Sequence, residues 1–177
     1  MKLVYQIPNK IYYIQQFLDY PSYKKIHYDA FRSKLITLKS TKEEWQKSLI
    51  HGYKDSVQKA HLVTNYPPLQ KIKILLENNP FHRIKIKNFH PLIHSMTKYA
   101  GINWHDDTTH IYGITYYLNH RWNKKYGGEF LFKDEQSNGF IPLVGNSIVI
   151  IKSPFQHKVA PVMNPSVPRK TIQIFVN

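Results

Sequence analysis

The sequence contains no cysteine, which excludes disulfide bonds and thiolate metal sites, so any metal ligand must be a histidine or a carboxylate. It also has no apolar run that approaches the roughly 20 residues needed to span a bilayer. The first ten residues, MKLVYQIPNK, lack the long apolar stretch and the small-residue cleavage site of a signal peptide. These absences predict a soluble, cytoplasmic protein without membrane insertion.

Acidic residues are scarce as well. Eleven Asp and Glu stand against 25 Lys and Arg, which gives a formal net charge of +14. A basic chain attracts anionic partners such as nucleic acid, but coding bias toward Lys, Ile, Asn and Tyr gives the same excess, and both explanations stay open. The excess is uneven, since residues 1–97 carry 16 basic and 6 acidic side chains and residues 98–177 carry 9 and 5.

The length of 177 residues suits one domain with a sizeable core. Three patterns in the first half predict helices, because apolar residues recur at helical spacing or follow capping signals. They are NKIYYIQQFLDY with Ile11, Ile14 and Leu18, STKEEWQKSLIHGY with Trp45 and Leu49, and YPPLQKIKILLENNP with Leu69, Ile72 and Leu76.

From Phe81 onward the pattern changes to alternation between polar and apolar residues, which is typical of strands. The alternating or apolar runs are HRIKIKNF, HIYGITYYLN, GGEFLFKD, SIVIIKS and RKTIQIFVN, and the breaks contain Gly127-Gly128, Asn138-Gly139 and Gly145-Asn146. Short strands without intervening helices predict an antiparallel sandwich or barrel. We therefore expect one α+β domain over residues 1–177, with mainly supporting helices and the first strands in 1–97 and the catalytic β-rich part in 98–177.

The stretch WHDD contains a possible metal site. Residues two apart on a strand share a face, so His105 and Asp107 lie together and Asp106 points the other way. One imidazole and one carboxylate are two of the three ligands of a 2-His-1-carboxylate site. His157, just after the apolar run 148–151, is the candidate for the third ligand.

Arg169 opens the last predicted strand, twelve residues after His157. An arginine on the inner face of a barrel is costly unless it meets an anion. A dicarboxylate held by the planar guanidinium, with a tyrosine hydroxyl as helper, explains such a residue, whereas an outward-facing arginine needs no ligand.

The order of these motifs resembles a known family. H-x-D, then YYLN…W, GGEF, H-x-V-x-P-V and R-x-T-I-x-I-F look like the Fe(II)- and 2-oxoglutarate-dependent oxygenases, and within them the prolyl 4-hydroxylase-like branch. The similarity runs from about Tyr99 to Asn177. It implies a double-stranded β-helix, a cupin-like jelly-roll, with supporting N-terminal helices.

Residue by residue, the resemblance implies His105, Asp107 and His157 as iron ligands and Arg169 as the catalytic residue that binds the distal carboxylate of 2-oxoglutarate. It implies Tyr117 as a hydrogen-bond donor to the same carboxylate and Tyr99 as a residue near the oxoacid. The GGE turn is structural in this comparison. Gln173 stands where some members carry a hydroxyl residue.

The cofactors that the resemblance implies are Fe(II), 2-oxoglutarate and O2, with ascorbate as a stimulant. A carboxylate at Asp107 favours hydroxylation over halogenation. The implied function is hydroxylation of a protein or peptide side chain, with proline first. The alternatives are oxidative modification of nucleic acid, favoured by the charge but lacking a second arginine in RKTIQIFVN, and a β-barrel that binds a partner without catalysis.

Overall fold

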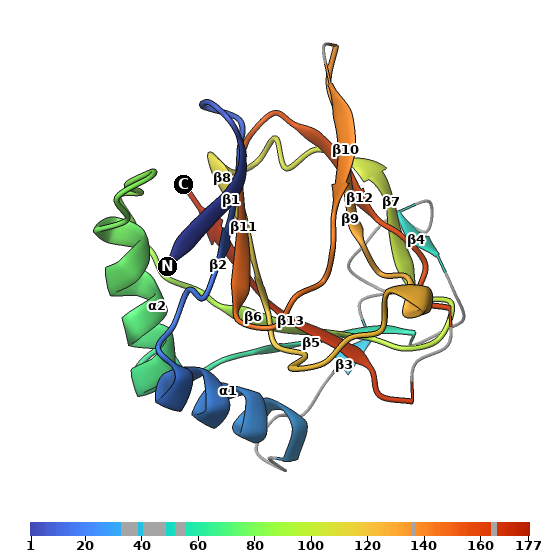
Figure 1. The fold of residues 1–177 in the computed structure, drawn as a ribbon, viewed down its shortest axis with the longest axis horizontal. Coiled ribbons are helices and arrows are strands. Elements are labelled where there is room, and N and C mark those ends of the chain that lie inside the picture. The colour runs from blue at the N-terminus through green and yellow to red at the C-terminus, as the bar shows by residue number, and fades with distance from the viewer. Residues whose placement is uncertain (33–38, 41–48, 52–55, 136, 164–165) are drawn as a thin grey trace.

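The structure, a computed structural model, describes residues 1–32, 39–40, 49–51, 56–135, 137–163 and 166–177. These residues form two antiparallel sheets, and two helices cover the outside of the larger one (Figure 1). Across the larger sheet the strands are β1 (Lys2–Ile7), β2 (Ile11–Gln15), β11 (Ser147–Lys152), β8 (Tyr112–Tyr117), β13 (Arg169–Val176), β6 (Leu92–Met96), β5 (Val57–His61) and β3 (Lys39–Ser40). Across the smaller sheet they are β10 (Asn138–Ile141), β9 (Phe130–Lys133), β12 (Gln156–Val159), β7 (Gly101–His105) and β4 (Ile50–His51).

The larger sheet is buried on both faces, and its side chains alternate between two cores. On β11, Ile148 and Ile150 pack into the core beneath the helices, whereas Val149 and Ile151 point into the core between the sheets. Burial on both faces explains why this strand is an almost continuous apolar run. The space between the two sheets is where the polar residues of interest gather.

Helix α2 (Pro67–Glu77) confirms the third helical pattern of the sequence. Prolines occupy its first turn, where the missing amide hydrogen leaves no bond unmade. Leu69, Ile72 and Leu76 are fully buried against the larger sheet.

The prediction of a helix over the NKIYYIQQFLDY stretch is wrong, because Ile11–Gln15 form strand β2. Ile11 and Tyr13 face the core between the sheets, and Tyr12 and Ile14 face the helices. A helix would bury one stripe of these residues, but a strand between two neighbours buries all four. The aromatic and β-branched side chains of this segment suit that position.

The first helix instead is α1 (Tyr20–Arg32), which the patterns above do not predict. It begins after Asp19, whose carboxylate accepts hydrogen bonds from the backbone N–H and the hydroxyl of Ser22. An aspartate followed by Pro21 in the first turn is a start signal that the sequence does contain.

The structure also bears on one further predicted helix, one predicted strand and one predicted turn. The helix predicted over STKEEWQKSLIHGY lies largely outside the described residues, and its flanks Lys39–Ser40 and Ile50–His51 are short strands. HRIKIKNF is not a strand, although Ile84 and Ile86 alternate with exposed residues and are buried. Asn138-Gly139 belongs to β10, and the turn lies just before it, where Asp134 N–H donates to Ser137 O.

Two facing antiparallel sheets with helices on one side confirm the predicted α+β fold, a double-stranded β-helix. The strands expected over 112–117, 130–133, 147–152 and 169–176 are all present. Among the described residues, no helix has the length and apolar character to cross a membrane. The assignment of residues 1–177 to one domain stays a prediction, and residues before 98 supply strands to both sheets.

Replacing Leu76 by alanine should lower the free energy of unfolding by about 2–5 kcal/mol, because it opens a cavity in the core beneath α2. The control is Ile74→Ala on the same helix, whose side chain is 55% exposed and whose loss should change stability by less than about 0.5 kcal/mol. Chemical unfolding of both variants checks the packing of α2, and equal losses would contradict it.

Candidate active site

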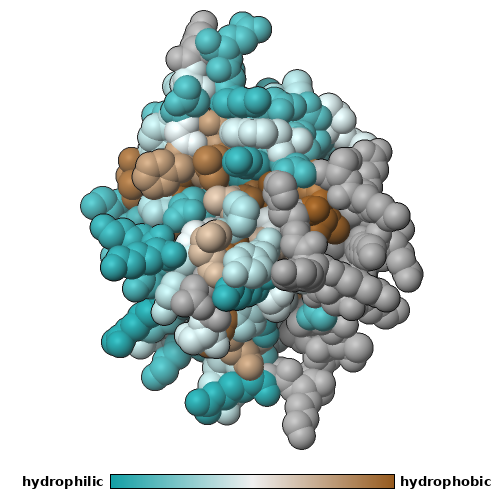
Figure 2. All heavy atoms as spheres, turned by 90° about the vertical axis from the view of Figure 1, so that its right-hand side faces the viewer, coloured by the Kyte–Doolittle hydropathy of each residue, from teal (hydrophilic) through white to brown (hydrophobic). Residues whose placement is uncertain are grey.

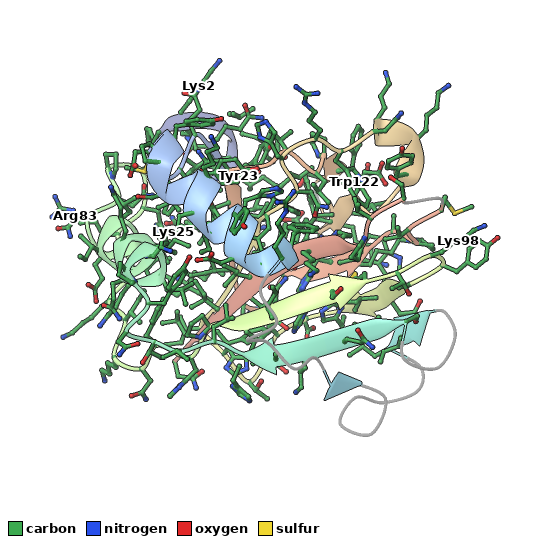
Figure 3. The ribbon with its side chains drawn as sticks, turned by 90° about the horizontal axis from the view of Figure 1, so that it is seen from below. Lys2, Tyr23, Lys25, Arg83, Lys98 and Trp122 are labelled. Carbon is green, nitrogen blue, oxygen red and sulfur yellow. The ribbon has the colours of Figure 1, made fainter. Side chains whose placement is uncertain are left out.

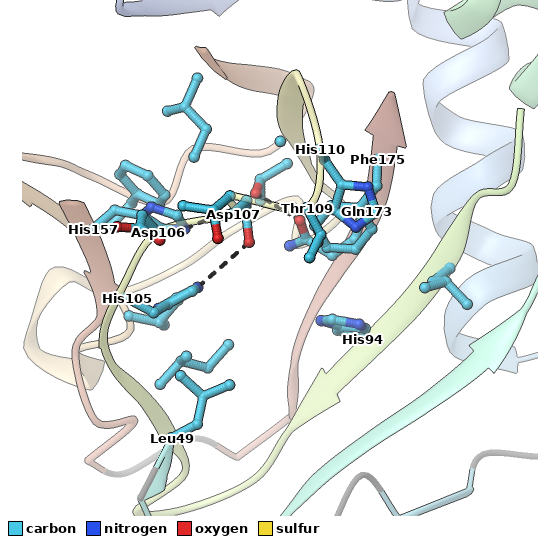
Figure 4. A pocket seen from close by; sticks show the side chains of 18 of the residues that line it. Leu49, His94, His105, Asp106, Asp107, Thr109, His110, His157, Gln173 and Phe175 are labelled. Carbon is cyan, nitrogen blue, oxygen red and sulfur yellow. Dashed lines mark hydrogen bonds and ion pairs between the residues drawn. The ribbon is translucent and has the colours of Figure 1, made fainter. Parts of the chain in front are cut away.

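The pairing of β7 with β12 brings two histidines together. His105, the last residue of β7, lies directly opposite His157 in the ladder, and the ring centroids are 4.1 Å apart. Asp107 follows two residues after the end of β7 and turns back toward both rings (Figure 4). One potential ligand atom from each of the three residues lies within 4.8 Å of the others.

The two imidazoles are oriented in the same way. His105 Nδ1 lies 2.7 Å from Asn103 O, and His157 Nδ1 lies 2.8 Å from Phe155 O, so each ring faces the carbonyl two residues before it. A proton on Nδ1 donates to that carbonyl and leaves the lone pair of Nε2 free. The Nε2 atoms lie 3.9 Å and 3.7 Å from the Asp107 carboxylate oxygens.

The protonation state of His157 fits a metal ligand. Burial, and then the neighbouring His105, lowers the pKa of His157 to about 4, although Asp107 opposes the shift. At pH 7 the His157 ring is therefore neutral, and its Nε2 can offer a lone pair. Two imidazoles and one carboxylate are a ligand set that suits a divalent cation such as Fe(II).

The surroundings hold the Asp107 loop in place. Ser153 Oγ donates a 2.9 Å hydrogen bond to Asp107 O, and Gln156 Nε2 donates a 3.2 Å bond to Asp106 Oδ2 on the other side. Asp106 therefore turns away from the two histidines, as the sequence predicts. A Cβ atom at Gly113 would overlap Asp107 Oδ2, so a side chain at this position of β8 would displace the carboxylate.

Arg169 is fully buried between the sheets at the start of β13. Its Nε donates to Gly128 O at 2.9 Å, and its Nη1 lies 3.6 Å from Met96 Sδ. Its Nη2 and the hydroxyl of Tyr117 are both buried and have no hydrogen-bond partner among the described residues. The guanidinium carbon lies 5.4 Å from the centre of the Tyr117 ring.

A carboxylate would satisfy both unpaired groups, since buried donors are rarely left without acceptors. Burial raises the pKa of Tyr117 to about 12 even though Arg169 opposes the shift, so the phenol keeps its proton and can donate. The residues present therefore fit 2-oxoglutarate, whose distal carboxylate would lie against Arg169 and Tyr117.

The inner face of β8 connects this pair of residues with the metal ligands. Gly113 lies against Asp107, Thr115 is the next inward residue, and Tyr117 lies near Arg169. Four residues of strand span about 13 Å. Midway, Thr115 Oγ1 donates a 2.9 Å hydrogen bond to Gln173 Oε1 of β13, its partner in the ladder.

A cavity of about 580 Å³ opens at the metal ligands. Its walls include His94, Trp104, Phe130, Gln173 and Phe175 as well as the triad, as Figure 4 shows for much of the lining. Burial lowers the pKa of His94 to about 3, with Arg169 and Lys59 acting in the same direction, so this ring is neutral at pH 7. The volume is within the range of small-molecule sites.

The structure brings five of the six predicted site residues to the space between the sheets: His105, Asp107, His157, Arg169 and Tyr117. It does not bring Tyr99 there. Tyr99 has a left-handed backbone conformation (φ 67°) in the turn between β6 and β7, and its side chain is 41% exposed outside the lining of the cavity. Sequence reasoning missed Gly113, and it left Gln173 unexplained.

The comparisons with known proteins agree with this geometry. The family model described as "2OG-Fe(II) oxygenase superfamily" matches residues 92–177. No curated protein matches the sequence.

Three similar solved structures cover nearly the whole chain. A Pseudomonas putida prolyl-4-hydroxylase has a TM-score of 0.69 at 14% identity, covering 96% of this chain and 94% of its own. A prolyl hydroxylase from Trichoplax adhaerens, in complex with a hypoxia inducible factor oxygen degradation domain peptide fragment, has a TM-score of 0.70 at 16% identity, covering 96% and 84%. OsALKBH1 has a TM-score of 0.59 at 13% identity, covering 99% and 100%. At these identities the three structures support the fold alone.

Gly113→Ala should weaken binding of Mn(II), because the added Cβ displaces the Asp107 carboxylate. We expect the loss to approach that of Asp107→Ala, with the circular dichroism spectrum unchanged, when Mn(II) affinity is measured by calorimetry. Wild-type Mn(II) affinity in Gly113→Ala would contradict the contact between Gly113 and the ligand.

Arg169→Ala should weaken binding of 2-oxoglutarate to the Mn(II)-loaded protein by about 2–5 kcal/mol, because it removes the partner of a desolvated carboxylate. Mn(II) affinity itself should stay near the wild-type value. Arg169→Lys should restore only part of the loss, since an ammonium lacks the planar fork of the guanidinium. Equal 2-oxoglutarate affinity in the wild type and Arg169→Ala would exclude this role.

Proposed function

We propose that this chain is a 2-oxoglutarate-dependent dioxygenase that hydroxylates a side chain of a protein or peptide, with proline the first candidate. The match of residues 92–177 to the family model of the 2OG-Fe(II) oxygenase superfamily supports this proposal. One observation carries the proposal. A triad that can hold a divalent cation and a buried arginine that can pair with an anion face the same space between the sheets. Fe(II) and 2-oxoglutarate together supply that cation and that anion.

The residues of the chain have distinct roles in this proposal. His105, Asp107 and His157 would hold the metal, and Arg169 with Tyr117 would hold the distal carboxylate of the co-substrate. When bound, the metal supplies O2 activation coupled to oxidative decarboxylation of 2-oxoglutarate to succinate and CO2. The apolar part of the cavity wall would exclude water from the site; it includes Ile102, Phe130 and Val159.

Several observations favour a peptide over nucleic acid. Asp106, Asp134 and Glu135 line a smaller hollow that shares Asp106 with the metal cavity. Lys10 and Lys133 line this hollow as well, and Lys10 is paired with Asp134, so the hollow offers a polyanion no surplus of positive charge. Basic side chains also project from different sides of the molecule, as Lys2, Arg83 and Lys98 do in Figure 3. The last strand holds Arg169 without a second arginine after it.

Nucleic acid remains the second candidate, because the net charge is +14 and OsALKBH1 shares the fold. If the charge is dispersed, binding of oligonucleotides should be weak and should fall steeply with added salt, as counterion release requires. Peptide binding should depend less on salt.

The test is product mass after incubation with Fe(II), 2-oxoglutarate, ascorbate and either a proline-containing peptide panel or methylated and unmethylated oligonucleotides. We expect a gain of one oxygen on a peptide and oligonucleotides that bind at low ionic strength but stay unmodified. Asp107→Ala is the control and should give no product with either substrate, because it removes a metal ligand. Oxidised oligonucleotide with unmodified peptide would make the second candidate the correct function.

A further inference from the structure

The outer face of the smaller sheet carries a row of large side chains that the site described above does not use. Phe140 of β10 pairs with Leu131 of β9, and Leu131 pairs with Lys158 of β12. Trp104 of β7 continues the row, since its ring lies beneath the Lys158 ammonium at 5.3 Å from the ring centre. Four adjacent strands, each about 4.8 Å from the next, therefore present one continuous row to solvent.

Successive side chains on a strand point to opposite faces of the sheet, and this alternation places the row on the outer face. Phe130 and Phe132 of β9 are buried between the sheets, so Leu131 and Lys133 face the other way, and His157 on β12 has the same relation to Lys158. Phe140 is 66% exposed and Trp104 is 38% exposed. This face of the molecule, shown in Figure 2, has apolar side chains grouped among polar ones.

Two positive charges converge on the tryptophan. Lys133 Nζ lies 4.5 Å from the centre of the Trp104 ring, so ammonium groups from two different strands share one aromatic ring. The attraction between cation and ring holds both ammonium groups near one position on the surface. Such a pair suits a carboxylate, while the exposed rings and Leu131 suit apolar side chains.

The row leads directly to the metal site. Trp104 precedes the metal ligand candidate His105, and it also contributes to the wall of the metal cavity. A chain bound along the row can therefore continue over the rim and into the cavity.

We propose that Trp104, Leu131, Lys133, Phe140 and Lys158, the docking row, bind an acidic and apolar segment of the peptide substrate beside the residue that is hydroxylated. This inference rests on the proposed peptide function. Asp134 and Glu135 lie next to Lys133 in the sequence and line the neighbouring hollow. Asp134 is paired with Lys10, and Glu135 adds a negative charge beside Lys133. An evenly charged polyanion therefore fits this surface less well than a peptide that places one or two acidic residues at the lysines.

The test uses peptides that share one proline-containing core and differ in a flanking segment. The flank combines leucine with aspartate, asparagine or lysine. It is placed at several distances on either side of the proline. Binding is measured by calorimetry on the Mn(II)- and 2-oxoglutarate-loaded protein, and turnover is measured with Fe(II). The acidic flank should bind roughly two- to fivefold more tightly than the neutral one and lower KM with little change in kcat.

Lys158→Glu should reverse the preference, so that the lysine flank binds more tightly than the aspartate flank. Trp104→Leu should weaken all peptides with an apolar flank. The matched control is Lys24→Gln, because the Lys24 ammonium also lies over an exposed ring, that of Tyr20, but on α1. Lys24→Gln should keep the preference of the wild type, and Lys158→Glu and Lys24→Gln should both bind 2-oxoglutarate normally.

The outcomes separate this inference from the function on which it rests. If peptides are hydroxylated equally well with every flank, or if Lys158→Glu leaves the flank preference unchanged, the docking row is wrong and the peptide function is unaffected. If only oligonucleotides are oxidised, the peptide function fails, and a loss of their binding in Lys158→Glu would assign the row to nucleic acid instead.

Discussion

Two charged groups that face the space between the two sheets, a carboxylate beside two histidines and a buried arginine, determine what this molecule can bind. The Asp107 carboxylate and the free lone pairs of His105 and His157 need a cation, and the buried guanidinium of Arg169 needs an anion. Arg169 is fully buried, and a buried charge without a partner costs several kcal/mol. A ligand carboxylate that pairs with Arg169 therefore stabilises the folded protein, so binding and stability are linked.

The sheets keep the two ends of this site apart and rigid. β7 and β12 fix the histidines opposite each other, while β8 and β13 carry Tyr117 and Arg169 in the facing sheet. Glycine makes room at both ends. Gly113 admits the Asp107 carboxylate, and a Cβ at Gly128, which has a φ of 78°, would lie 3.0 Å from Arg169 Cδ. The helices stabilise the far side of the larger sheet and leave the inner face to the chemistry.

The sequence predicts the site better than it predicts the strands that hold it. The H-x-D motif identifies His105 and Asp107, yet β7 has no clear alternation, and Asp107 lies beyond its end. The segment Ile11–Gln15 is apolar at spacings that fit a helix or a strand, and only its position between β1 and β11 decides for the strand. Local periodicity carries no information about such neighbours.

The residues that were missed depend on contacts across the sheet. The bond between Thr115 and Gln173 exists because β8 and β13 pair in one particular register, and 58 residues separate the two side chains in the chain. The same is true of the convergence of Lys133 and Lys158 on Trp104. A linear motif cannot specify these contacts, whereas the buried arginine was predictable because its cost has few explanations.

The most direct measurement of the central claim is an anomalous-scattering map from crystals grown with Mn(II) and 2-oxoglutarate. The account requires one manganese peak bounded by His105 Nε2, His157 Nε2 and an Asp107 oxygen, with the distal carboxylate of the oxoacid hydrogen-bonded to Arg169 and the Tyr117 hydroxyl. A metal held instead by Asp106, His110 or His120, or an oxoacid bound away from Arg169, would contradict it.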